Sequence, residues 1–468
     1  MKKTKIIATL GPSSDDPKIM EKLIDAGANV FRINFSHATE EEKENRIKYL
    51  REIEKRRKIP VAILQDLQGP KIRVGILPSE GVQLKVGKEI TLTVDEPKDG
   101  EVPVQYKGIV GDVSAGDRVL LADGKMELKV LSKTAKNIKC KVVTGGVLTS
   151  KKGINLPTSS ISLPALSEKD KRDVAYGLKN DVDYIALSFV KSEDDIKDLR
   201  KIITQAGKKT KIIAKIERHE AIANIDEIIE ASDAIMVARG DLGIEVSLAD
   251  VPLHQKDIIK KCNSCGKPVI VATQMLDSMI RNPISTRAET SDIANAILDG
   301  ADAVMLSDET AVGKYPVNAV KAMRKIALHA ERWSNDTHKI IGEDAIKSIN
   351  STSEAIGKSA CKLAAELKAK VIINATARGK TTRNVARFRP HCHIISVTHT
   401  LKTARELELV WGVIPFVLNY KTVREMSLKS TEIAKSLGLV KKGDKIIIVS
   451  GEEVGVEGGT NIIKVKEL

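Results

Sequence analysis

Eight short apolar segments that alternate with helical patterns, except for an insert after the third, constrain the fold of this chain more than any other feature. Buried parallel strands have such continuous apolar runs, because helices cover both faces of their sheet. Eight strand–helix units are the number that closes a (β/α)8 TIM barrel, an α/β fold, so we expect one here. The segments cover residues 5–10, 29–35, 61–67, 184–190, 211–216, 234–238, 268–273 and 303–306.

The spacing of the segments indicates a discontinuous barrel. Residues 74–163, between the third and the fourth segment, contain short alternating runs with turn signals, which predict an inserted all-β domain in the form of a small barrel. After a polar stretch at 334–351, the remaining chain predicts an open α/β domain. We therefore expect a barrel over residues 1–73 and 164–333, the insert over 74–163, and a C-terminal α/β domain over 350–468.

Polar residues follow the apolar run at nearly every predicted strand end. Carboxyl ends of barrel strands form the rim that carries active sites, whereas an open doubly wound sheet gathers polar groups at one switch point. Lys215 and Glu217 end one strand, and Arg239 and Asp241 end the next. Two carboxylates with a lysine between them suit a metal site that also holds a phosphate; the alternative is an ion pair that braces the rim. The other rim residues are Arg32, Asn34, Ser36, Asp66, Ser188, Thr273, Gln274, Ser307 and Glu309.

Composition narrows the class of function. The chain has 468 residues, 42% hydrophobic and 29% charged, which is typical of a folded globular protein. Its net charge of +14 invites a nucleic-acid partner, but only 3% of residues are aromatic, too few for base stacking, and a polyanionic small-molecule substrate explains the charge as well. Without a signal peptide or a membrane-length apolar run, we expect a cytoplasmic protein. Cys262 and Cys265 match half a zinc site, and no second pair completes it.

Eight motifs occur in order along nearly the whole chain. They are TKIIATLGPSS (4–14), NVFRINFSH (29–37), GPKIR (69–73), KKGINLP (151–157), IIAKIE (212–217), MVARGDLG (236–243), ATQML (272–276) and MLSDET (305–310). Together they resemble the pyruvate kinase family. The resemblance implies a barrel with the insert as a mobile lid, a C-terminal regulatory domain, and transfer of a phosphoryl group from phosphoenolpyruvate to ADP, giving pyruvate and ATP at the end of glycolysis.

The resemblance also implies roles for the rim residues. Glu217 and Asp241 match the ligands of a divalent cation, Mg²⁺ or Mn²⁺. Lys215 matches the lysine that bridges the phosphoryl group and later the enolate oxygen, and Arg32 would hold the phosphate from the opposite side. Thr273 matches a threonine on the route of the proton. The backbone N–H groups of Arg239, Gly240 and Asp241 are expected to hold the substrate carboxylate. A water chain that includes Ser307 and Glu309 is expected to supply the proton.

Five further positions match family residues near the nucleotide. Asn34, His37, Arg73 and Lys152 lie at positions that approach the ADP phosphates, and Asp123 matches a lid aspartate that closes on the metal–nucleotide. Without the resemblance, His37 is more often a capping or packing histidine, and Asp123 followed by glycine is an ordinary turn.

Two departures from the family pattern are informative. The family's potassium site corresponds to Asn34, Ser36, Asp66 and Leu67, but this chain has Lys71 where potassium-dependent members have glutamate. An ammonium at Lys71 can replace the monovalent charge, so we expect activity without K⁺. Asp308 stands where many members have glycine, and nothing in the sequence explains it.

The C-terminal part contains a strand–turn–helix loop at residues 374–382. It is not a Walker A loop, because the leading glycine is replaced by Asn374. The loop resembles the one that holds a phosphorylated effector in pyruvate kinases; the alternative is a turn without a ligand. Its candidate residues are Thr376, Arg378, Gly379, Lys380 and Thr381.

The resemblance implies a homotetramer, with no nucleic acid and no membrane as partner. One alternative is another metal-dependent phosphoenolpyruvate or pyruvate barrel, such as an aldolase or lyase, which would have no ADP for the lid, Arg73 and Lys152 to hold. A second alternative is an RNA- or polyanion-binding scaffold, whose affinity would fall steeply with salt.

Overall fold

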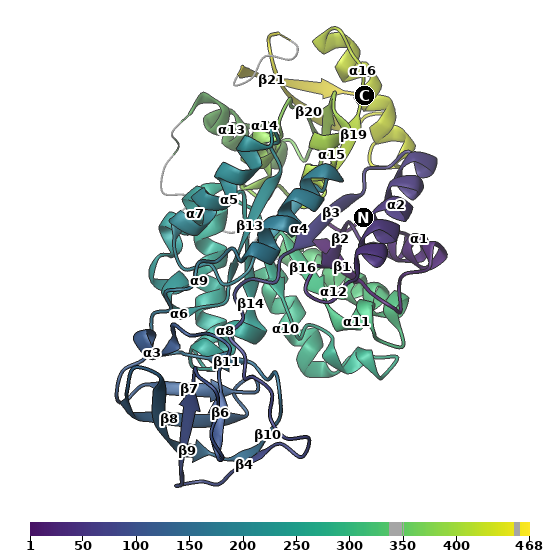
Figure 1. The fold of residues 1–468 in the computed structure, drawn as a ribbon. Coiled ribbons are helices and arrows are strands. Elements are labelled where there is room, and N and C mark those ends of the chain that lie inside the picture. The colour runs from purple at the N-terminus through teal and green to yellow at the C-terminus, as the bar shows by residue number, and fades with distance from the viewer. Residues whose placement is uncertain (337–348, 350, 454–458) are drawn as a thin grey trace.

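The computed structural model describes residues 1–336, 349, 351–453 and 459–468 (Figure 1). Eight parallel strands form a closed barrel in the order β1-β16-β15-β14-β13-β12-β3-β2, which confirms the predicted fold. Each predicted segment contains one of them. Their bounds are β1 (Lys5–Leu10), β2 (Val30–Asn34), β3 (Ala62–Asp66), β12 (Tyr184–Leu187), β13 (Lys211–Ile216), β14 (Ala234–Ala238), β15 (Val269–Ala272) and β16 (Ala303–Leu306).

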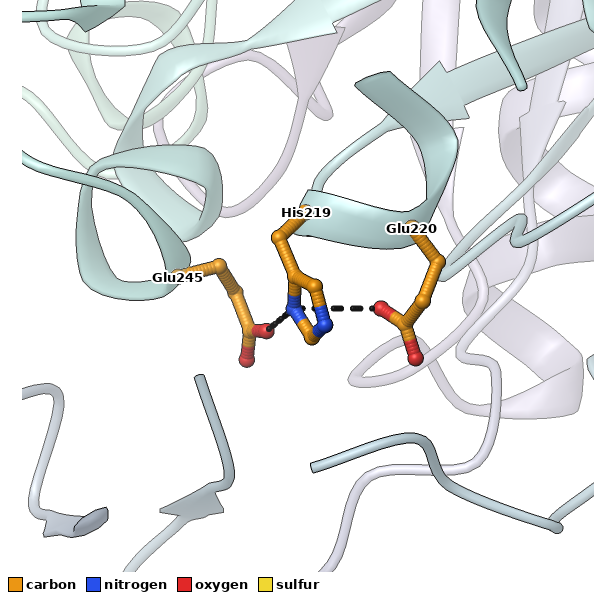
Figure 2. Close-up of side chains that lie close together, drawn as sticks. All are labelled: His219, Glu220 and Glu245. Atoms are coloured by element: carbon orange, nitrogen blue, oxygen red, sulfur yellow. Dashed lines mark hydrogen bonds and ion pairs between the residues drawn. The ribbon is translucent and has the colours of Figure 1, made fainter. Parts of the chain in front are cut away.

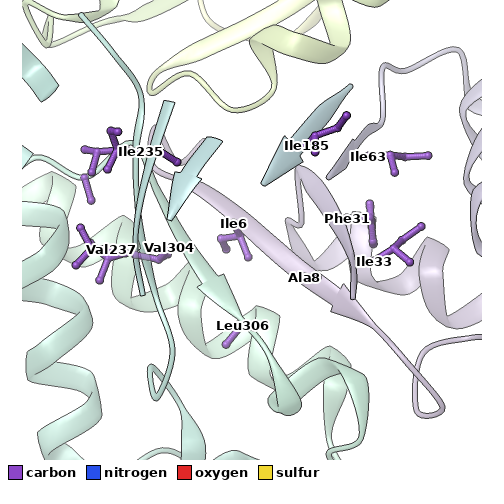
Figure 3. Packing of buried hydrophobic residues seen from close by; sticks show 14 of the residues in the cluster. Ile6, Ala8, Phe31, Ile33, Ile63, Ile185, Ile235, Val237, Val304 and Leu306 are labelled. Carbon is purple, nitrogen blue, oxygen red and sulfur yellow. The ribbon is translucent and has the colours of Figure 1, made fainter. Parts of the chain in front are cut away.

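Helices surround the barrel and bury the outward face of its strands. Ile6 of β1 and Ile63 of β3 belong to the cluster between strands and helices (Figure 3), whereas Ile7 belongs to a smaller cluster inside the barrel. This alternation is the period of a strand. The surrounding helices are α1 (Pro17–Ala26), α2 (Glu40–Arg57), α4 (Glu168–Lys179), α5 (Glu193–Gln205), α6 (His219–Ala223), α7 (Ile225–Ala231), α8 (Arg239–Glu245), α9 (Val251–Cys265), α10 (Arg287–Leu298), α11 (Asp308–Ala311) and α12 (Pro316–Asp336), with a 3₁₀ turn at Asp277–Ile280.

Local sequence determines where several of these helices begin. The Thr39 hydroxyl accepts the backbone N–H of Glu42, and the Thr39 backbone N–H donates to the Glu42 carboxylate in return, so α2 begins with a capping box. Thr286 and Glu289 form the same reciprocal pair at α10. Such caps satisfy N–H groups that have no partner within the helix.

The insert extends from one end of the barrel (Figure 1) and has its own core. Its strands pair as one six-stranded sheet, β11-β7-β8-β9-β5-β6, and one two-stranded sheet, β10-β4. This differs from the single small barrel that the sequence predicts for residues 74–163, a stretch the structure describes throughout. The elements are β4 (Val82–Leu84), β5 (Glu89–Thr93), β6 (Glu101–Pro103), α3 (Ile109–Asp112), β7 (Arg118–Leu121), β8 (Met126–Lys133), β9 (Asn137–Thr144), β10 (Gly146–Leu148) and β11 (Ile154–Asn155).

The C-terminal part lies at the opposite end of the barrel from the insert (Figure 1). Its five-stranded sheet has the order β19-β18-β17-β20-β21, with β21 antiparallel to β20. Arg389 joins it to the barrel through Asp302 at 2.8 Å. The predicted join at 334–351 falls mostly outside the described residues. The elements are α13 (Thr352–Glu366), β17 (Val371–Ala375), α14 (Lys380–Ala386), β18 (His393–Thr398), α15 (Leu401–Leu407), β19 (Val413–Val417), α16 (Val423–Ser436), β20 (Lys445–Gly451) and β21 (Thr460–Glu467).

Among the helices that the structure describes, none is long and apolar enough to span a membrane.

Candidate active site

Lys215 lies at the centre of the rim formed by the carboxyl ends of the barrel strands. Its Nζ is 2.9 Å from Glu217 Oε1 and 3.2 Å from Asp66 Oδ1, and it donates to Ser188 Oγ at 2.7 Å. Burial opposes the charged form, but Asp66 and Glu217 raise the pKa of Lys215 above its ordinary value. Lys215 is therefore a fixed ammonium at neutral pH.

Arg32 is a second cation that pairs with the Asp66 carboxylate. Its Nε lies 2.6 Å from Asp66 Oδ2, and its Nη1 donates to Thr9 Oγ1 at 3.1 Å. Thr9 in turn donates to the carbonyl of Leu306 at 2.7 Å, so three barrel strands fix the guanidinium. Burial alone would raise the pKa of Asp66, but Lys215 and Arg32 together hold it below its ordinary value.

Glu217 and Asp241 supply the carboxylates predicted for a metal. Glu217 is almost fully buried and accepts the backbone N–H of Phe189 at 2.7 Å. Burial raises the pKa of Glu217, the Lys215 ammonium opposes this, and the charge of Asp241 adds to it. A hard divalent cation would relieve the repulsion between the two carboxylates, and carboxylate oxygens are its preferred ligands. The residues present therefore fit a divalent metal.

Hydrogen bonds join the segment after β14 to the segment after β15. Arg239 at the start of α8 contacts Asp292 at 2.7 Å and donates to the carbonyl of Thr273 at 2.8 Å. The N–H of Gly240 donates to Thr273 Oγ1 at 2.8 Å, so this hydroxyl engages one N–H of the group expected to receive a carboxylate. Thr273 and Gln274 have φ angles of 72° and 54°, a left-handed conformation that is uncommon for non-glycine residues and is enriched at active sites.

Glu309 holds the loop after β15 and the end of β16 by hydrogen bonds. Its two carboxylate oxygens accept the N–H groups of Leu276 at 3.0 Å and Ser307 at 2.7 Å. Burial raises the pKa of Glu309 despite these bonds. Because both oxygens hold backbone groups, the arrangement favours a positioning role over the expected place in a water chain.

The tip of the β7–β8 hairpin carries Asp123 to the mouth of the site. Lys71 Nζ lies 3.7 Å from Asp123 Oδ1. A Cβ built on the next residue, Gly124, would lie 3.7 Å from a side-chain carbon of Ile244 in α8, so the tip approaches this helix. The structure thus brings the predicted lid aspartate and Lys71 together across the boundary between insert and barrel.

The two chain segments that connect barrel and insert carry the predicted nucleotide cations. Arg73 pairs with Gly153 in a β-bridge, and the N–H of Val74 donates to the carbonyl of Lys152 at 2.9 Å. Arg73 and Lys152 therefore lie on adjacent strands of the connection. His37 is exposed in the turn after β2.

The residues predicted for a former potassium site are mostly engaged with protein groups. The Asn34 side chain accepts the N–H of Ser36 at 3.0 Å, and the carbonyl of Leu67 accepts a serine hydroxyl at 2.8 Å. Asp66 is paired with two cations. Within the part of the chain that the structure describes, Lys71 forms its ion pair with the insert and not with Asp66.

In the predicted effector loop, some side chains are bonded within the protein and others are exposed. Thr376 accepts the N–H of Gly379 at 2.9 Å, which closes the turn. Thr381 contacts Thr460 of β21 at 2.7 Å between their hydroxyls and is buried there. The exposed members of the loop are Arg378 and Lys380.

A second ionic cluster joins the insert to the barrel. His219 Nδ1 lies 3.2 Å from Glu220 and 3.4 Å from Glu245 (Figure 2). Both carboxylates are already engaged, because Arg218 donates to Glu220 at 2.9 Å and Asn155 of β11 donates to Glu245 at 2.9 Å. We interpret the cluster as a hydrogen-bonded joint and not as a metal site.

Sequence reasoning missed three contributors to the site. Thr9 orients Arg32, the N–H of Phe189 holds Glu217, and the pair of Asn155 and Glu245 anchors the insert. Thr9 could have been found from its place near the end of the first apolar segment. The other contacts depend on a backbone amide and on a pairing 90 residues apart, for which the sequence pattern has no signal.

Two family models match the chain: pyruvate kinase, barrel domain, over residues 1–320, and pyruvate kinase, alpha/beta domain, over residues 354–466. Pyruvate kinases from Staphylococcus epidermidis and Staphylococcus aureus are each 44% identical over 470 residues, covering 99% of this chain and 80% of the relative. A crystal structure of a pyruvate kinase from Cryptosporidium parvum has a TM-score of 0.93 and 36% identity, covering 100% of this chain and 96% of that one. This chain belongs to the pyruvate kinase family.

Proposed function

We propose that this chain transfers the phosphoryl group of phosphoenolpyruvate to ADP, giving pyruvate and ATP. Pyruvate kinases act on these substrates and use a divalent metal. The observation that carries the proposal is the ammonium of Lys215, held between Asp66 and Glu217 at the end of β13. Phosphoryl transfer needs charge stabilisation and positioning more than covalent chemistry, and a fixed cation on the rim supplies both.

Two cations would hold the transferring group. Lys215 contacts the phosphoryl oxygens and then stays beside the enolate oxygen as it forms, while Arg32 holds the phosphoryl group from the opposite side. The start of α8, from Arg239 to Asp241, orients the substrate carboxylate. Thr273 lies on the route by which a proton reaches the methylene carbon, and Glu309 keeps its loop in place.

We assign Glu217 and Asp241 as ligands of Mg²⁺ or Mn²⁺. When bound, the metal supplies positive charge next to the phosphoryl oxygens. Glu217 is oriented by the N–H of Phe189, so its carboxylate is preorganised.

Residues on both sides of the lid connection would hold the nucleotide. Arg73 and Lys152 supply positive charge to the ADP phosphates, with Asn34 and His37 on the barrel side. Asp123 at the hairpin tip would approach the metal–nucleotide as the lid closes. The support for this assignment is the position of Asp123 against Lys71 and α8.

We further propose that activity does not require K⁺. The Asp66 carboxylate already pairs with Arg32 and Lys215, and Lys71 adds an ammonium at the mouth of the site. A monovalent cation would therefore add little charge. The variant Lys71→Glu should gain a dependence on K⁺ that the parent protein lacks.

The wider proposals follow from family membership. They are a homotetramer, a cytoplasmic location, a phosphorylated effector at residues 376–381, and domains over 1–73 with 164–333, over 74–163, and over 350–468. Their tests are the mass of the protein in solution and limited proteolysis at the proposed boundaries.

The first experiment is pyruvate formation from phosphoenolpyruvate and ADP with Mg²⁺, in K⁺-free buffer and again with KCl. Equal activity in both buffers supports the reaction and the role of Lys71. Activity only with KCl keeps the reaction and contradicts the role of Lys71. Folded protein that is inactive in both buffers favours the lyase alternative or an obligatory activator.

A further inference from the structure

A short segment after β12, residues 188–191, contacts both the active-site rim and the base of the insert. On the rim side, Ser188 Oγ accepts the Lys215 ammonium at 2.7 Å, and the N–H of Phe189 donates to the Glu217 carboxylate at 2.7 Å. The 188–191 segment therefore positions the cation proposed to hold the phosphoryl group and one of the proposed metal ligands.

The chain that leaves the barrel for the insert packs on the same two residues. Ser188 Oγ donates to the carbonyl of Leu67 at 2.8 Å. Gly69 lies so close that a Cβ built on it would be 2.8 Å from a ring carbon of Phe189 and 2.9 Å from the Ser188 Cβ. Because side chains do not tolerate such an approach, a larger residue at position 69 would displace either the connection or the 188–191 segment.

The chain that returns from the insert is held by Lys191. Its Nζ donates to the carbonyls of Ile161 at 2.8 Å and Leu163 at 2.7 Å. The main chain of Lys191 is itself fixed, since its N–H donates to the Asp195 carboxylate at 2.8 Å and its carbonyl accepts the Asn224 amide at 2.9 Å. An anchored backbone thus carries an ammonium that binds the last residues of the insert.

The backbone between these contacts is strained. Phe189 has a φ angle of 57°, a left-handed conformation that is uncommon for a bulky residue. Such a conformation persists only where the surrounding structure holds it. Gly69 packs against Phe189 from one side, and Lys191 lies two residues further along the chain. A shift in either connection of the insert would therefore reach the N–H that orients Glu217.

We propose that Lys191 is a positioning residue that couples the base of the insert to the metal ligand Glu217 through the 188–191 segment. The proposal rests on the divalent-metal site of the proposed function and deepens it. Coupling between two sites is reciprocal. A cation bound at Glu217 should therefore order the returning connection, and loosening that connection should weaken the binding of the cation. The metal would in this way prepare the insert for the nucleotide.

Mn²⁺ binding to the whole protein without substrates, measured by EPR, tests the proposal. Lys191→Met keeps the apolar stem and removes the ammonium, so it should weaken Mn²⁺ binding by about tenfold, within the range for residues that orient a metal ligand. Lys191→Arg keeps donors for both carbonyls and should restore most of the affinity. Lys201→Met, at an exposed lysine on α5, is the matched control and should bind Mn²⁺ like the parent protein.

Hydrogen–deuterium exchange provides a readout that a merely structural role would not change. In the parent protein, Mn²⁺ should slow amide exchange over residues 157–166, because the returning connection becomes ordered. In Lys191→Met saturated with Mn²⁺, this slowing should be absent. If Lys191 only stabilised the fold, its loss would speed exchange equally with and without Mn²⁺.

A pair of glycine variants tests the coupling from the outgoing connection. Gly69 and Gly87 have φ angles of 70° and 80°, so alanine strains the backbone similarly at both positions. A Cβ at Gly87 would have no atom within 4 Å, whereas a Cβ at Gly69 would meet the 188–191 segment. Gly69→Ala should therefore weaken Mn²⁺ binding by about tenfold, and Gly87→Ala should leave it unchanged.

The proposal is overturned if folded Lys191→Met binds Mn²⁺ like the parent protein or keeps the Mn²⁺-dependent slowing of exchange. It is also overturned if the parent protein does not bind Mn²⁺ at millimolar concentration. If Lys191→Met does not fold, the glycine pair decides, and equal effects of its two members overturn the proposal. None of these readouts requires turnover, so a parent protein that binds Mn²⁺ and forms no pyruvate contradicts the proposed reaction and not the coupling.

Discussion

The two ends of β13 carry lysines in opposite circumstances. At the carboxyl end, the Lys215 side chain is 12% exposed, lies between Asp66 and Glu217, and hydrogen-bonds Ser188. At the amino end, Lys211 is half-buried, shares a carboxylate with an arginine, and faces a cavity with more cations than carboxylates. Both lysines belong to one strand of six residues.

This difference separates two uses of positive charge. A buried and fully paired cation has fixed geometry, so it can stabilise charge that develops during a reaction without reorganising. Partly solvated cations in excess have no such geometry, but they attract an anion from solution. The rim therefore has the fixed charge geometry that chemistry needs, whereas the opposite end of β13 has looser positive charge that attracts anions, and variants at each end test this contrast.

The largest expected effect is at the carboxyl end of β13, where Lys215 lies between two carboxylates. Lys215→Met removes the cation that holds the phosphoryl group and leaves Asp66 and Glu217 unbalanced, so the turnover rate should fall by at least about 10³. Lys201→Met, on the exposed face of α5, is the control for expression and folding. Steady-state rates at saturating substrates measure the effect, and a loss of less than about tenfold contradicts the role.

Thr273→Val tests the proton route on the same rim. Removing the hydroxyl should lower proton exchange at the methyl group of pyruvate by about 10²-fold, within the range for a group that moves a proton. Phosphoryl transfer to ADP should fall less, because the cations remain. NMR in deuterated water measures proton exchange at the methyl group separately from phosphoryl transfer.

Thr273→Ser is the matched control for this prediction, since it keeps the hydroxyl that accepts the N–H of Gly240. It should restore most of the exchange rate. If valine and serine lower both steps equally, Thr273 acts only by holding the loop.

The joint between insert and barrel should give a smaller effect. Asn155→Ala removes a buried hydrogen bond to the Glu245 carboxylate, a bond worth about 1.5–3 kcal/mol. Loosening the insert should raise KM for ADP by about tenfold and change KM for phosphoenolpyruvate less.

A double-mutant cycle with Glu245→Ala tests this pairing. If the two residues act together, the double variant should be little worse than the worse single variant. Fully additive effects would contradict a direct role of this bond in holding the lid.

Much of the barrel could be predicted from the sequence. The bounds of β1, β13, β14 and β16 coincide with the apolar segments, because strands buried on both faces have an uninterrupted apolar pattern. The strands of the insert were harder to predict from the sequence. Its longest strands include β8 (Met126–Lys133), which alternates buried and exposed residues and follows the Ala122–Gly124 turn; short alternating runs with turn signals predict an all-β insert but not the bounds of such a strand.

The site shows the same limit. That Arg32, Asp66 and Lys215 gather on one rim follows from barrel topology, since all three lie near carboxyl ends of strands. Their pairing does not follow, because it depends on side-chain rotamers across three strands. The family resemblance implied that Asp66 belongs to a former monovalent-cation site, whereas the structure pairs it with Arg32 at 2.6 Å and Lys215 at 3.2 Å.

The smallest expected effect is at the amino end of β13, where the buried Glu406 lines the same cavity as Lys211. Because the pKa of Glu406 rises from the ordinary 4.5 to about 7 on folding, the folded protein binds more protons than the unfolded chain between these values. Stability contributed by the neutral form is present below about pH 4.5 and is lost as pH rises through about 7. Glu406→Gln cannot ionise, so its melting temperature should exceed that of the parent protein by a few degrees at pH 8 and converge with it near pH 4.5. Other titrating groups are common to both proteins, and the difference between their thermal melts isolates Glu406. A difference that is constant with pH would show that folding does not raise the pKa of Glu406, and would remove the contrast between the two ends of β13.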